Sequence, residues 1–353
     1  MRRLLGIALH SEEVQRGLEA VRELGLIAKG YEISKTKNGA VVPLIREPTV
    51  LEMKRLKERL NVLEIRQVEF ECSKAISKDL RNLPEIPSAL RSELPRSFDI
   101  IGEIAIVEIP QILTDYSAVI GNTIIENNSH VRLVVQKSSD IMGTFRTRKY
   151  VRVAGSGNTE TVYREFGCRY RLDVAEVYFS PRLSYERMRI ARQVRRDEVV
   201  VDMFAGVGPY SILIAKSQQT SRIYSIDINP IAIRYLEENA FANRVADRVI
   251  ALLGDSREVS TKRLRNVADR VIMNLPSEAD HYIDAACQLL RKEGGRMHFY
   301  KFATRDESID SIKDLLRSSV EEQNRVIVSF EYCSAIKEVS PTRVQIAVDT
   351  FVR

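Results

Sequence analysis

The sequence predicts an α/β protein: a doubly wound, mostly parallel sheet of seven strands with a reversed terminal hairpin, preceded by two smaller α+β domains. From about residue 177 onward, strand-length apolar runs alternate with helix-length periodic segments. Strands that are separated by helices are parallel, because the crossover needs the helix. The last two runs, residues 325–333 and 343–351, leave no room for a helix and therefore form an antiparallel pair. The length of 353 residues also exceeds one typical core.

Residues 1–70 are expected to form a small first domain. Residues 11–24 have the periodicity of an amphipathic helix with Gly25 as its cap, and residues 40–44 are typical of a short strand. No motif here carries chemistry. Its basic side chains, such as Lys54, fit a nucleic-acid contact or a solvated helix equally well.

Residues 71–176 are expected to form a mixed α+β middle domain. After a proline-punctuated stretch, residues 97–110 are expected to be one buried strand bounded by proline. Further strands are predicted at residues 130–136, 143–153 and 159–166. The second of these would carry Arg146 and Arg148 on one face, since side chains two apart in a strand point the same way.

Residues 199–229 indicate a strand, a glycine turn, a helix and a second strand. Gly206 and Gly208 allow a ligand to approach backbone amides at the helix N-terminus. Pro209 suits the first helical position, where a missing amide hydrogen costs nothing. Asp227 ends the second strand, where doubly wound folds place the carboxylate that accepts from both hydroxyls of a ribose.

Asp202 separates two kinds of adenosine-containing cofactor. Its carboxylate directly precedes the turn, where it would repel the pyrophosphate of a nicotinamide cofactor but suits the cationic amino-acid end of S-adenosylmethionine. The turn also reads A-G-V-G-P, which departs from G-x-G-x-x-G. Both observations favour S-adenosylmethionine over NAD.

Two further strand ends carry polar residues, and ligands of open parallel sheets bind beyond the carboxyl ends of the strands. Asp255, followed by Ser256, is placed to accept from an adenine amino group. Asn274-Leu275-Pro276 resembles the Asn-Pro-Pro-aromatic turn with which methyltransferases hold a planar nitrogen. Each residue has a simpler interpretation as a helix cap or turn former. Seven strands with a reversed hairpin are the class I (Rossmann-like) methyltransferase architecture.

Charge and composition indicate the kind of substrate and the cellular location of the protein. Residues 131–196 hold 15 basic and 6 acidic side chains, a net charge of +9 that would favour a polyanionic substrate or form a solvated basic face. No run of eighteen apolar residues and no signal peptide is present, so we expect a cytoplasmic protein without a membrane segment. The cysteines are too dispersed to predict a disulfide framework or a metal site: Cys72, Cys168, Cys287 and Cys333.

Four motifs together resemble one family. They are YFSPRLSYER at 178–187, DMFAGVGPY at 202–210, IDINP at 226–230 and MNLP at 273–276. In combination they strongly resemble the archaeal and eukaryotic tRNA (guanine-37-N1) methyltransferases. The resemblance covers about residues 97–353, including the stretch around Arg146, and residues 1–70 match it only loosely.

The resemblance implies a tRNA-modifying enzyme with S-adenosylmethionine as cofactor. Residues 1–70 would inspect the outer corner of the tRNA, residues 71–176 would bind RNA, and residues 177–353 would be the S-adenosylmethionine-dependent catalytic domain. The partner would be tRNA, bound at its anticodon stem-loop and outer corner. We expect a monomer.

The resemblance implies catalytic roles for two residues. Guanine N1 carries a proton at neutral pH, so its methylation needs a base and a cation near O6. The resemblance implies Glu186 as the base and Arg146 as the O6 partner, with Arg148 as the alternative. For Glu186 the simpler role is a capping carboxylate at a helix start. The residues expected around the donor are Tyr178, Arg187, Asp202, Gly206, Gly208, Asp227, Ile228, Asp255, Ser256, Asn274 and Pro276.

Three other functions remain open from the sequence. One is transfer of the aminocarboxypropyl group of the same cofactor to a modified guanine, and another is methylation of a tricyclic wyosine-type guanine at the same position. The third is a non-catalytic protein that binds S-adenosylmethionine or tRNA. Residues 180–182 and 274–276 favour methyl transfer, and Glu186 beside an intact donor site argues against a protein without activity.

Overall fold

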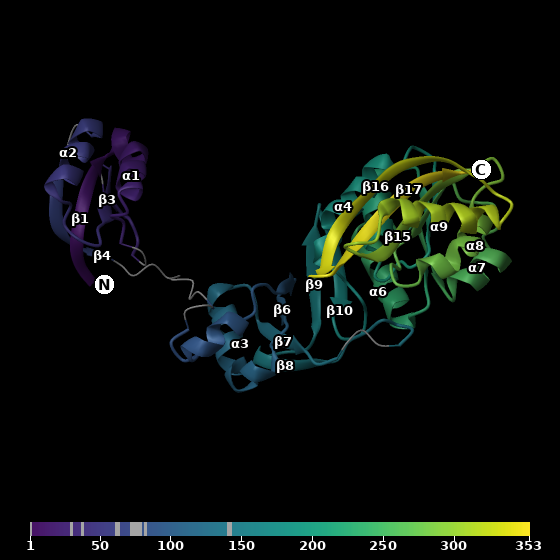
Figure 1. Cartoon of the computed structure of the whole chain (residues 1–353), viewed down its shortest axis with the longest axis horizontal. Helices are drawn as coiled ribbons and strands as arrows, with labels where there is room; N and C mark the ends of the chain where they lie inside the picture. Colours follow the sequence, from purple (N-terminus) through teal and green to yellow (C-terminus); the bar gives the residue numbers. More distant parts are fainter. Residues whose placement is uncertain are drawn as a thin grey trace. The chain divides into compact units, whose positions relative to one another are not determined.

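The computed structural model describes residues 2–28, 31–36, 39–60, 64–70, 80, 83–139 and 143–353 (Figure 1). It divides into two compact units, Met1–Ser92 with Glu126–Ser129, and Glu93–Ile125 with His130–Arg353. The boundary expected after residue 70, and Cys72 beside it, lie at residues outside the described ranges. The division into three domains therefore stays a prediction.

The first unit contains a four-stranded sheet with the strand order β2-β3-β1-β4, in which neighbouring strands are antiparallel. Ile7, Val21 and Leu56 are buried between this sheet and its helices. The helix and the strand expected from the sequence are confirmed, and Gly25 follows the helix with a φ of +65°. The elements are β1 (Arg2–His10), η1 (Ser11–Glu13), α1 (Val14–Glu23), β2 (Ser34–Thr36), β3 (Gly39–Pro43), α2 (Val50–Arg59) and β4 (Glu64–Phe70).

A second four-stranded sheet, in the order β5-β6-β7-β8, contradicts two expectations. Residues 97–110 form two antiparallel strands, which turn at Gly102 with a φ of +58°. The expected strand 143–153 begins only at Tyr150, and Arg146 lies in a turn with a φ of +55°, so Arg146 and Arg148 do not share a strand face. The elements are η3 (Ser88–Glu93), β5 (Asp99–Ile101), β6 (Ile104–Val107), η4 (Gln111–Tyr116), α3 (Ser117–Asn127), β7 (Leu133–Lys137) and β8 (Tyr150–Gly155).

The large sheet has seven strands in the order β13-β12-β11-β14-β15-β17-β16. Strand β17 is antiparallel to both β15 and β16, which confirms the reversed hairpin. Strand β16 is longer than expected, so only residues 341 and 342 connect the pair. The strands are β11 (Val199–Asp202), β12 (Arg222–Asp227), β13 (Val249–Leu253), β14 (Arg270–Met273), β15 (Gly295–Thr304), β16 (Ile327–Ser340) and β17 (Arg343–Val352).

Helices cover both faces of this sheet (Figure 1). Because strand side chains alternate between faces, Val200 packs in the cluster with α4, α5 and α6, and Val201 in the cluster with α7, α8 and α9. Helix α7 is an element that the sequence did not predict. The helices are η5 (Pro181–Leu183), α4 (Ser184–Gln193), α5 (Pro209–Ser217), α6 (Pro230–Ala242), α7 (Ser256–Lys262), η6 (Ala279–Tyr282), α8 (Ile283–Leu289) and α9 (Ile309–Glu321).

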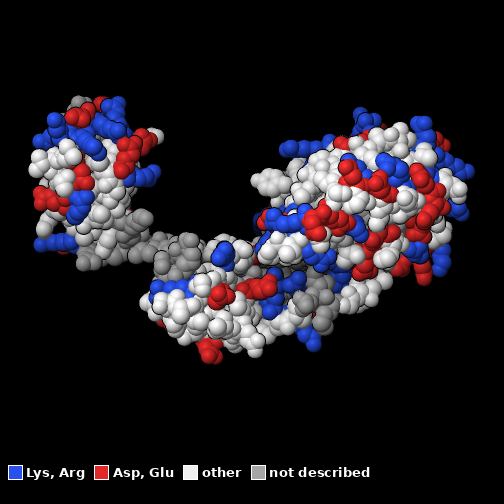
Figure 2. Space-filling view, viewed as in Figure 1, with Lys and Arg blue, Asp and Glu red and all other residues white. Residues whose placement is uncertain are grey.

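Acidic and basic side chains are interspersed over the face of the large-sheet region that is in view in Figure 2. None of the helices in the described ranges combines the length and apolarity that crossing a bilayer requires. The described cysteines Cys168, Cys287 and Cys333 are free. Among the described residues, no cluster of histidine, cysteine or acidic side chains is arranged to hold a metal ion.

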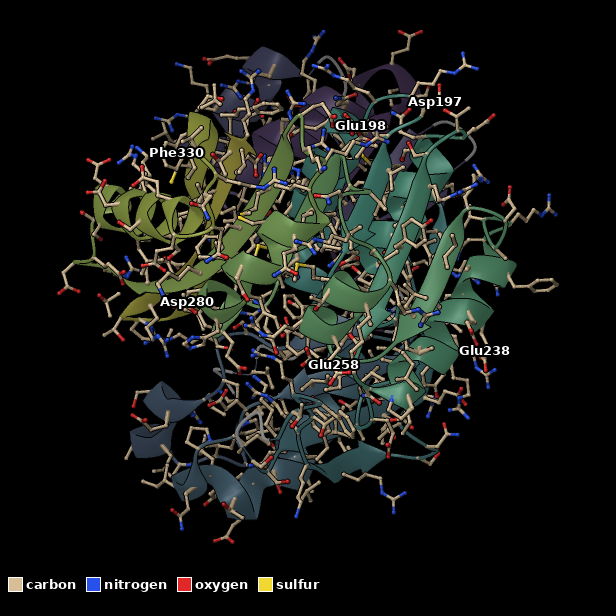
Figure 3. All side chains as sticks on the ribbon, turned by 90° about the vertical axis from the view of Figure 1, so that its right-hand side faces the viewer. Asp197, Glu198, Glu238, Glu258, Asp280 and Phe330 are labelled. Atoms are coloured by element: carbon tan, nitrogen blue, oxygen red, sulfur yellow. The ribbon has the colours of Figure 1, made fainter. Side chains whose placement is uncertain are left out.

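A two-stranded hairpin, β9 (Glu160–Glu165) with β10 (Cys168–Asp173), is fastened to α6 by side-chain amides. The amide oxygens of Asn239 and Asn243 accept from the backbone N–H groups of Arg171 and Arg169, at 2.7 and 2.9 Å. Glu238, labelled in Figure 3, accepts from the Arg171 guanidinium at 3.1 Å. The sequence predicted β9 but not β10.

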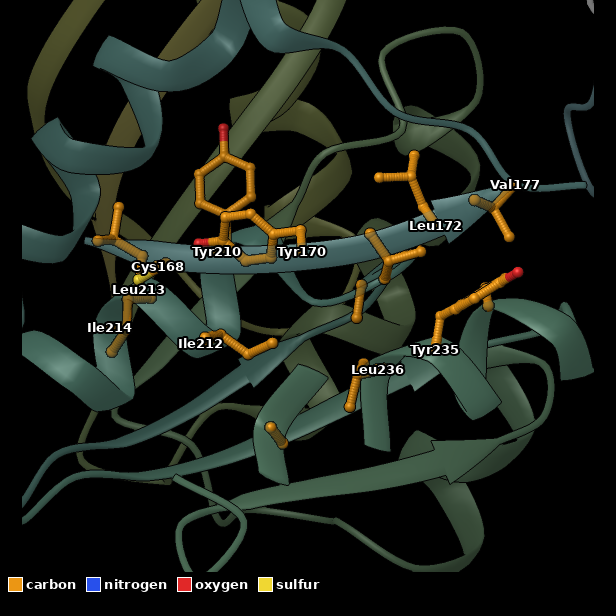
Figure 4. Packing of buried hydrophobic residues seen from close by; sticks show 14 of the residues in the cluster. Cys168, Tyr170, Leu172, Val177, Tyr210, Ile212, Leu213, Ile214, Tyr235 and Leu236 are labelled. Atoms are coloured by element: carbon orange, nitrogen blue, oxygen red, sulfur yellow. The ribbon is translucent and has the colours of Figure 1, made fainter. Parts of the chain in front are cut away.

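The inner face of the hairpin joins the core of the large sheet. Tyr170 and Leu172 of β10 are fully buried in one cluster with Ile212 of α5 and Leu236 of α6 (Figure 4). At about 25 cal/mol per Å² of apolar surface, each such side chain contributes roughly 1.5 to 3 kcal/mol. This packing fixes the segment that leads from β10 into α4.

Candidate active site

A cavity of about 310 Å³ lies beyond the carboxyl ends of the parallel strands. Four consecutive strands each contribute to its wall at or just beyond their carboxyl ends: β11 through Gly206, β12 through Asp227, β13 through Asp255 and β14 through Asn274. The turn at residues 143–146 supplies another part of the wall. The predicted residues that line the cavity are Arg146, Tyr178, Gly206, Asp227, Ile228, Asp255, Ser256, Asn274 and Pro276.

Asp227 is held in a fixed orientation at the cavity wall. Its carboxylate accepts from the Gly206 N–H at 2.7 Å and from the Asn229 N–H at 2.9 Å. Burial raises the pKa of Asp227, and these backbone hydrogen bonds oppose the rise. A carboxylate offers about four acceptor positions, so beside its backbone donors, Ile228 among them, Asp227 keeps acceptor capacity for a ligand. The arrangement fits the two hydroxyls of a ribose.

The neighbouring wall is aromatic and carries a second carboxylate. The rings of Phe204 and Tyr282 pack edge to face with centroids 5.1 Å apart. Asp255 caps α7 by accepting from the Arg257 N–H at 2.8 Å, and its other oxygen accepts from the Tyr282 hydroxyl at 3.5 Å. Asp255 is therefore both a helix cap and a cavity residue. Together with half-exposed Ile228, these side chains fit a flat, polar-edged ring such as adenine.

The Asn274-Leu275-Pro276 turn is anchored at both ends. The side-chain oxygen of Asn274 accepts from the Gln345 amide at 3.1 Å, and the Pro276 carbonyl accepts from the Phe302 N–H at 2.8 Å. In the part of the chain that the structure describes, the side-chain nitrogen of Asn274 has no partner. Its two N–H groups are free to donate to a ligand.

Arg146 lies at the cavity and Arg148 does not. The Arg146 guanidinium donates to the Ser277 hydroxyl, lies 4.0 Å from a Glu278 carboxylate oxygen, and has its Cζ 5.9 Å from the ring centroid of Tyr178. Arg148 lines only a second, adjoining cavity. Of the two alternatives for the O6 partner, Arg146 is the one that lines the same cavity as Asp227 and Asn274.

Glu186 begins α4 as expected but lines neither cavity. Its carboxylate accepts from Arg189 at 2.8 and 2.7 Å and from the Tyr300 hydroxyl at 2.6 Å, and its side chain is only 5% exposed. Arg189 also donates to Asp349, which is bonded to His298. Glu186 therefore belongs to a buried network between α4 and the sheet.

Three of the residues expected around the donor lie away from the cavity. Arg187 is buried and makes a two-bond ion pair with Glu165, with both N···O distances 2.6 Å. Asp202 is fully buried, accepts from the Ser211 hydroxyl at 2.8 Å, and has a pKa that burial raises to about 7. Gly208 caps the start of α5 with a φ of +86°, a left-handed conformation that favours glycine, and an added Cβ would lie 3.0 Å from the Ile212 side chain.

Sequence reasoning missed Phe204, Tyr282 and Gln345. Phe204 follows Asp202 in the first turn, and its place beyond a strand end was the available signal. Tyr282 and Gln345 come from η6 and β17, and no local pattern marks them. They reach the cavity only through the packing of distant elements.

Comparison with known proteins gives consistent matches. A family model described as TRM5/TYW2 methyltransferase domain matches residues 161–328, and one described as TYW2 N-terminal domain matches residues 79–159. The chain is 40% identical to tRNA (guanine(37)-N(1))-methyltransferase Trm5b of Pyrococcus abyssi over 93% of this chain and 92% of that protein. It is 34% identical to tRNA 4-demethylwyosine(37)-methyltransferase Taw21 of Saccharolobus solfataricus over 73% of this chain and 95% of that protein. The solved complex of aTrm5 and tRNALeu superimposes with a TM-score of 0.77 at 29% identity, covering 98% of this chain and 99% of that one.

Proposed function

The chain belongs to the TRM5/TYW2 methyltransferase family, and on that premise we propose that it methylates N1 of guanine 37 in tRNA. The observation that carries the proposal is the single cavity that joins Asp227, Asp255 and Asn274 to Arg146. Asp227 and Asp255 suit an adenosine, and Asn274 and Arg146 suit a purine base brought next to it. The methyl donor is S-adenosylmethionine, whose sulfonium supplies an electrophilic methyl group.

The chain's own residues hold the donor. Asp227 accepts from the ribose hydroxyls with the acceptor capacity that its backbone donors leave free. Phe204 and Tyr282 form one wall against the adenine, and Asp255 accepts from its amino group.

Arg146 and Glu186 are proposed to act on the guanine. The Arg146 guanidinium donates to O6, where negative charge develops as the N1 proton leaves. Asn274 donates from its free amide nitrogen and orients the ring. Glu186 accepts the N1 proton. Because Arg189 and Tyr300 occupy its carboxylate, this role requires Glu186 to exchange at least one of these bonds for the guanine.

The remaining parts of the chain are proposed to bind tRNA. Residues 1–70 would inspect the outer corner, residues 71–176 would bind RNA, and the net charge of +9 over residues 131–196 would neutralise backbone phosphates near the anticodon stem-loop. The protein would act as a monomer in the cytoplasm.

A second candidate is methylation of a tricyclic wyosine-type guanine at the same position. It is favoured by the 34% identity to Taw21, which extends over nearly all of that protein. The same cavity residues would hold the donor for this reaction, so the two candidates differ only in the base accepted.

Methyl transfer to unmodified tRNA tests the function. We expect the full chain to transfer radiolabelled methyl from S-adenosylmethionine to a transcript with guanine at position 37, and nucleoside mapping to identify 1-methylguanosine at that position. A transcript with adenine at position 37 is the control and should stay unlabelled. Label found only with tRNA that carries the tricyclic precursor would select the second candidate, and no label with either would reject both.

Asp227→Ala should weaken S-adenosylmethionine binding by roughly 10²-fold or more, since two hydrogen bonds to a charged acceptor are lost at about 1.5 to 3 kcal/mol each. Titration calorimetry measures the change. Asp247→Ala is the matched control, because the Asp247 side chain is 73% exposed and away from the cavity. Equal donor affinity for Asp227→Ala and the parent chain would remove Asp227 from the ribose site.

A further inference from the structure

The cavity that is proposed to hold S-adenosylmethionine is called the donor cavity below. A second cavity, of about 160 Å³, adjoins it and shares Arg146 and Tyr178 with it. Its wall combines the small sheet, the segment before α4 and the hairpin strand β16. Besides Arg146 it is lined by four cationic side chains, which we call the cation pocket: Lys137, Arg148, Arg182 and Lys337.

The carboxylates on this wall neutralise the cation pocket only in part. Asp99 accepts from Arg182 Nε at 2.6 Å and so compensates one of its cations, whereas Glu338 is 2.7 Å from Arg305, which does not line the pocket. Lys137 has a partner 3.3 Å away in Glu108, whose side chain is 78% exposed. Among the described residues, no carboxylate lies within 4.0 Å of Arg148 or Lys337. The pocket therefore holds uncompensated positive charge.

Lys337 is affected by the positive charges around it. Its Nζ donates to the Ser180 hydroxyl at 3.1 Å, a neutral partner. Burial lowers the pKa of Lys337 to about 8, with the charges of Arg182, Lys137 and Arg148 acting in the same direction and Asp99 opposing them. Cations that depress one another in this way gain most when an anion enters between them.

We propose that the cation pocket binds a backbone phosphate of the substrate RNA, at the nucleotide whose base occupies the donor cavity. The proposal rests on the proposed function for the identity of that nucleotide. The two cavities share a wall at Arg146 and Tyr178, which supports the proposal. If a base lies between Arg146 and the donor, the sugar-phosphate backbone of that nucleotide lies beside this shared wall. Guanidinium forks such as those of Arg148 and Arg182 match phosphate geometry, and partial desolvation strengthens each contact.

The test measures whether the loss of one lysine and the loss of one phosphate charge affect tRNA binding through the same contact. tRNA is prepared with a single neutral methylphosphonate at the linkage 5′ or 3′ of position 37, and binding to the full chain is measured by fluorescence without any methyl transfer. Lys337→Met is compared with the parent chain and with Lys262→Met, a control whose side chain is 71% exposed on α7. We expect Lys337→Met to weaken binding of unmodified tRNA about tenfold and to reduce the slope of log affinity against log salt by about 1.

The result depends on whether the effects of Lys337→Met and of the methylphosphonate are coupled. The proposal holds if one methylphosphonate weakens binding to the parent chain about tenfold and adds little further loss in Lys337→Met, while Lys262→Met behaves as the parent. The proposal is overturned if, at both linkages, the methylphosphonate and Lys337→Met each weaken tRNA binding by an independent, additive amount. It is also overturned if millimolar inorganic phosphate displaces tRNA equally well from Lys337→Met and from the parent chain. Because binding is read separately from methylation, coupling in a chain that does not methylate guanine 37 would reject the proposed function alone.

Discussion

Glu186→Gln is expected to slow single-turnover methylation by about 10²- to 10⁴-fold while tRNA and donor affinities change little, because the amide keeps the size of the side chain but cannot accept the N1 proton. Rapid quenching with saturating enzyme measures the chemical step. If Glu186 only orders the start of α4, the same variant should lose about 1 kcal/mol of stability or less and keep its rate.

The buried network supplies the control for this experiment. Tyr300→Phe removes one hydrogen bond to the Glu186 carboxylate and leaves the carboxylate and Arg189 in place. It should therefore keep the rate within a fewfold of the parent. A Glu186→Gln variant that methylates at the parent rate would end the general-base assignment, and an equal loss in Tyr300→Phe would make the network's geometry, and not proton acceptance, the cause.

Arg187→Met is expected to lower the free energy of unfolding by about 3 to 5 kcal/mol, because it leaves the Glu165 carboxylate buried without its partner. Both side chains are nearly inaccessible, at 2% and 4% exposure, and the pair joins α4 to the β9–β10 hairpin. Urea unfolding followed by circular dichroism measures the change.

Two variants separate the charge effect from lost packing. Arg187→Met with Glu165→Met removes both charges and should recover most of the stability. Arg171→Met breaks two ion pairs of the same hairpin, with Glu160 and Glu238; because this arginine is 53% exposed, the loss should be about 1 kcal/mol or less. If Arg187→Met is no more destabilising than Arg171→Met, the buried pair contributes nothing beyond a surface pair.

The local pattern was sufficient to predict that several strand-end residues line one cavity. Asp227, Asp255 and Asn274 were predicted because each follows an apolar strand, and the carboxyl ends of parallel strands meet at one edge. The same reasoning failed for Asp202, since the turn folds over it and its carboxylate points to Ser211. Arg187 was expected around the donor through the resemblance, whereas the structure pairs it with the buried Glu165, a partner that no local pattern in its motif indicates.

The sequence by itself determined the fold class, the reversed hairpin and the strand-end carboxylates, because these depend on periodicity and on backbone geometry between neighbours in the chain. Only the tertiary structure decided which side chains meet: Arg146 with Tyr178, Glu186 with Arg189 and Tyr300, and Lys337 with the other cations. The residues brought together lie up to 200 positions apart in the chain, as do Lys137 and Lys337, which line one cavity. Burial and charge at such contacts arise from packing between distant elements, on which no local pattern reports.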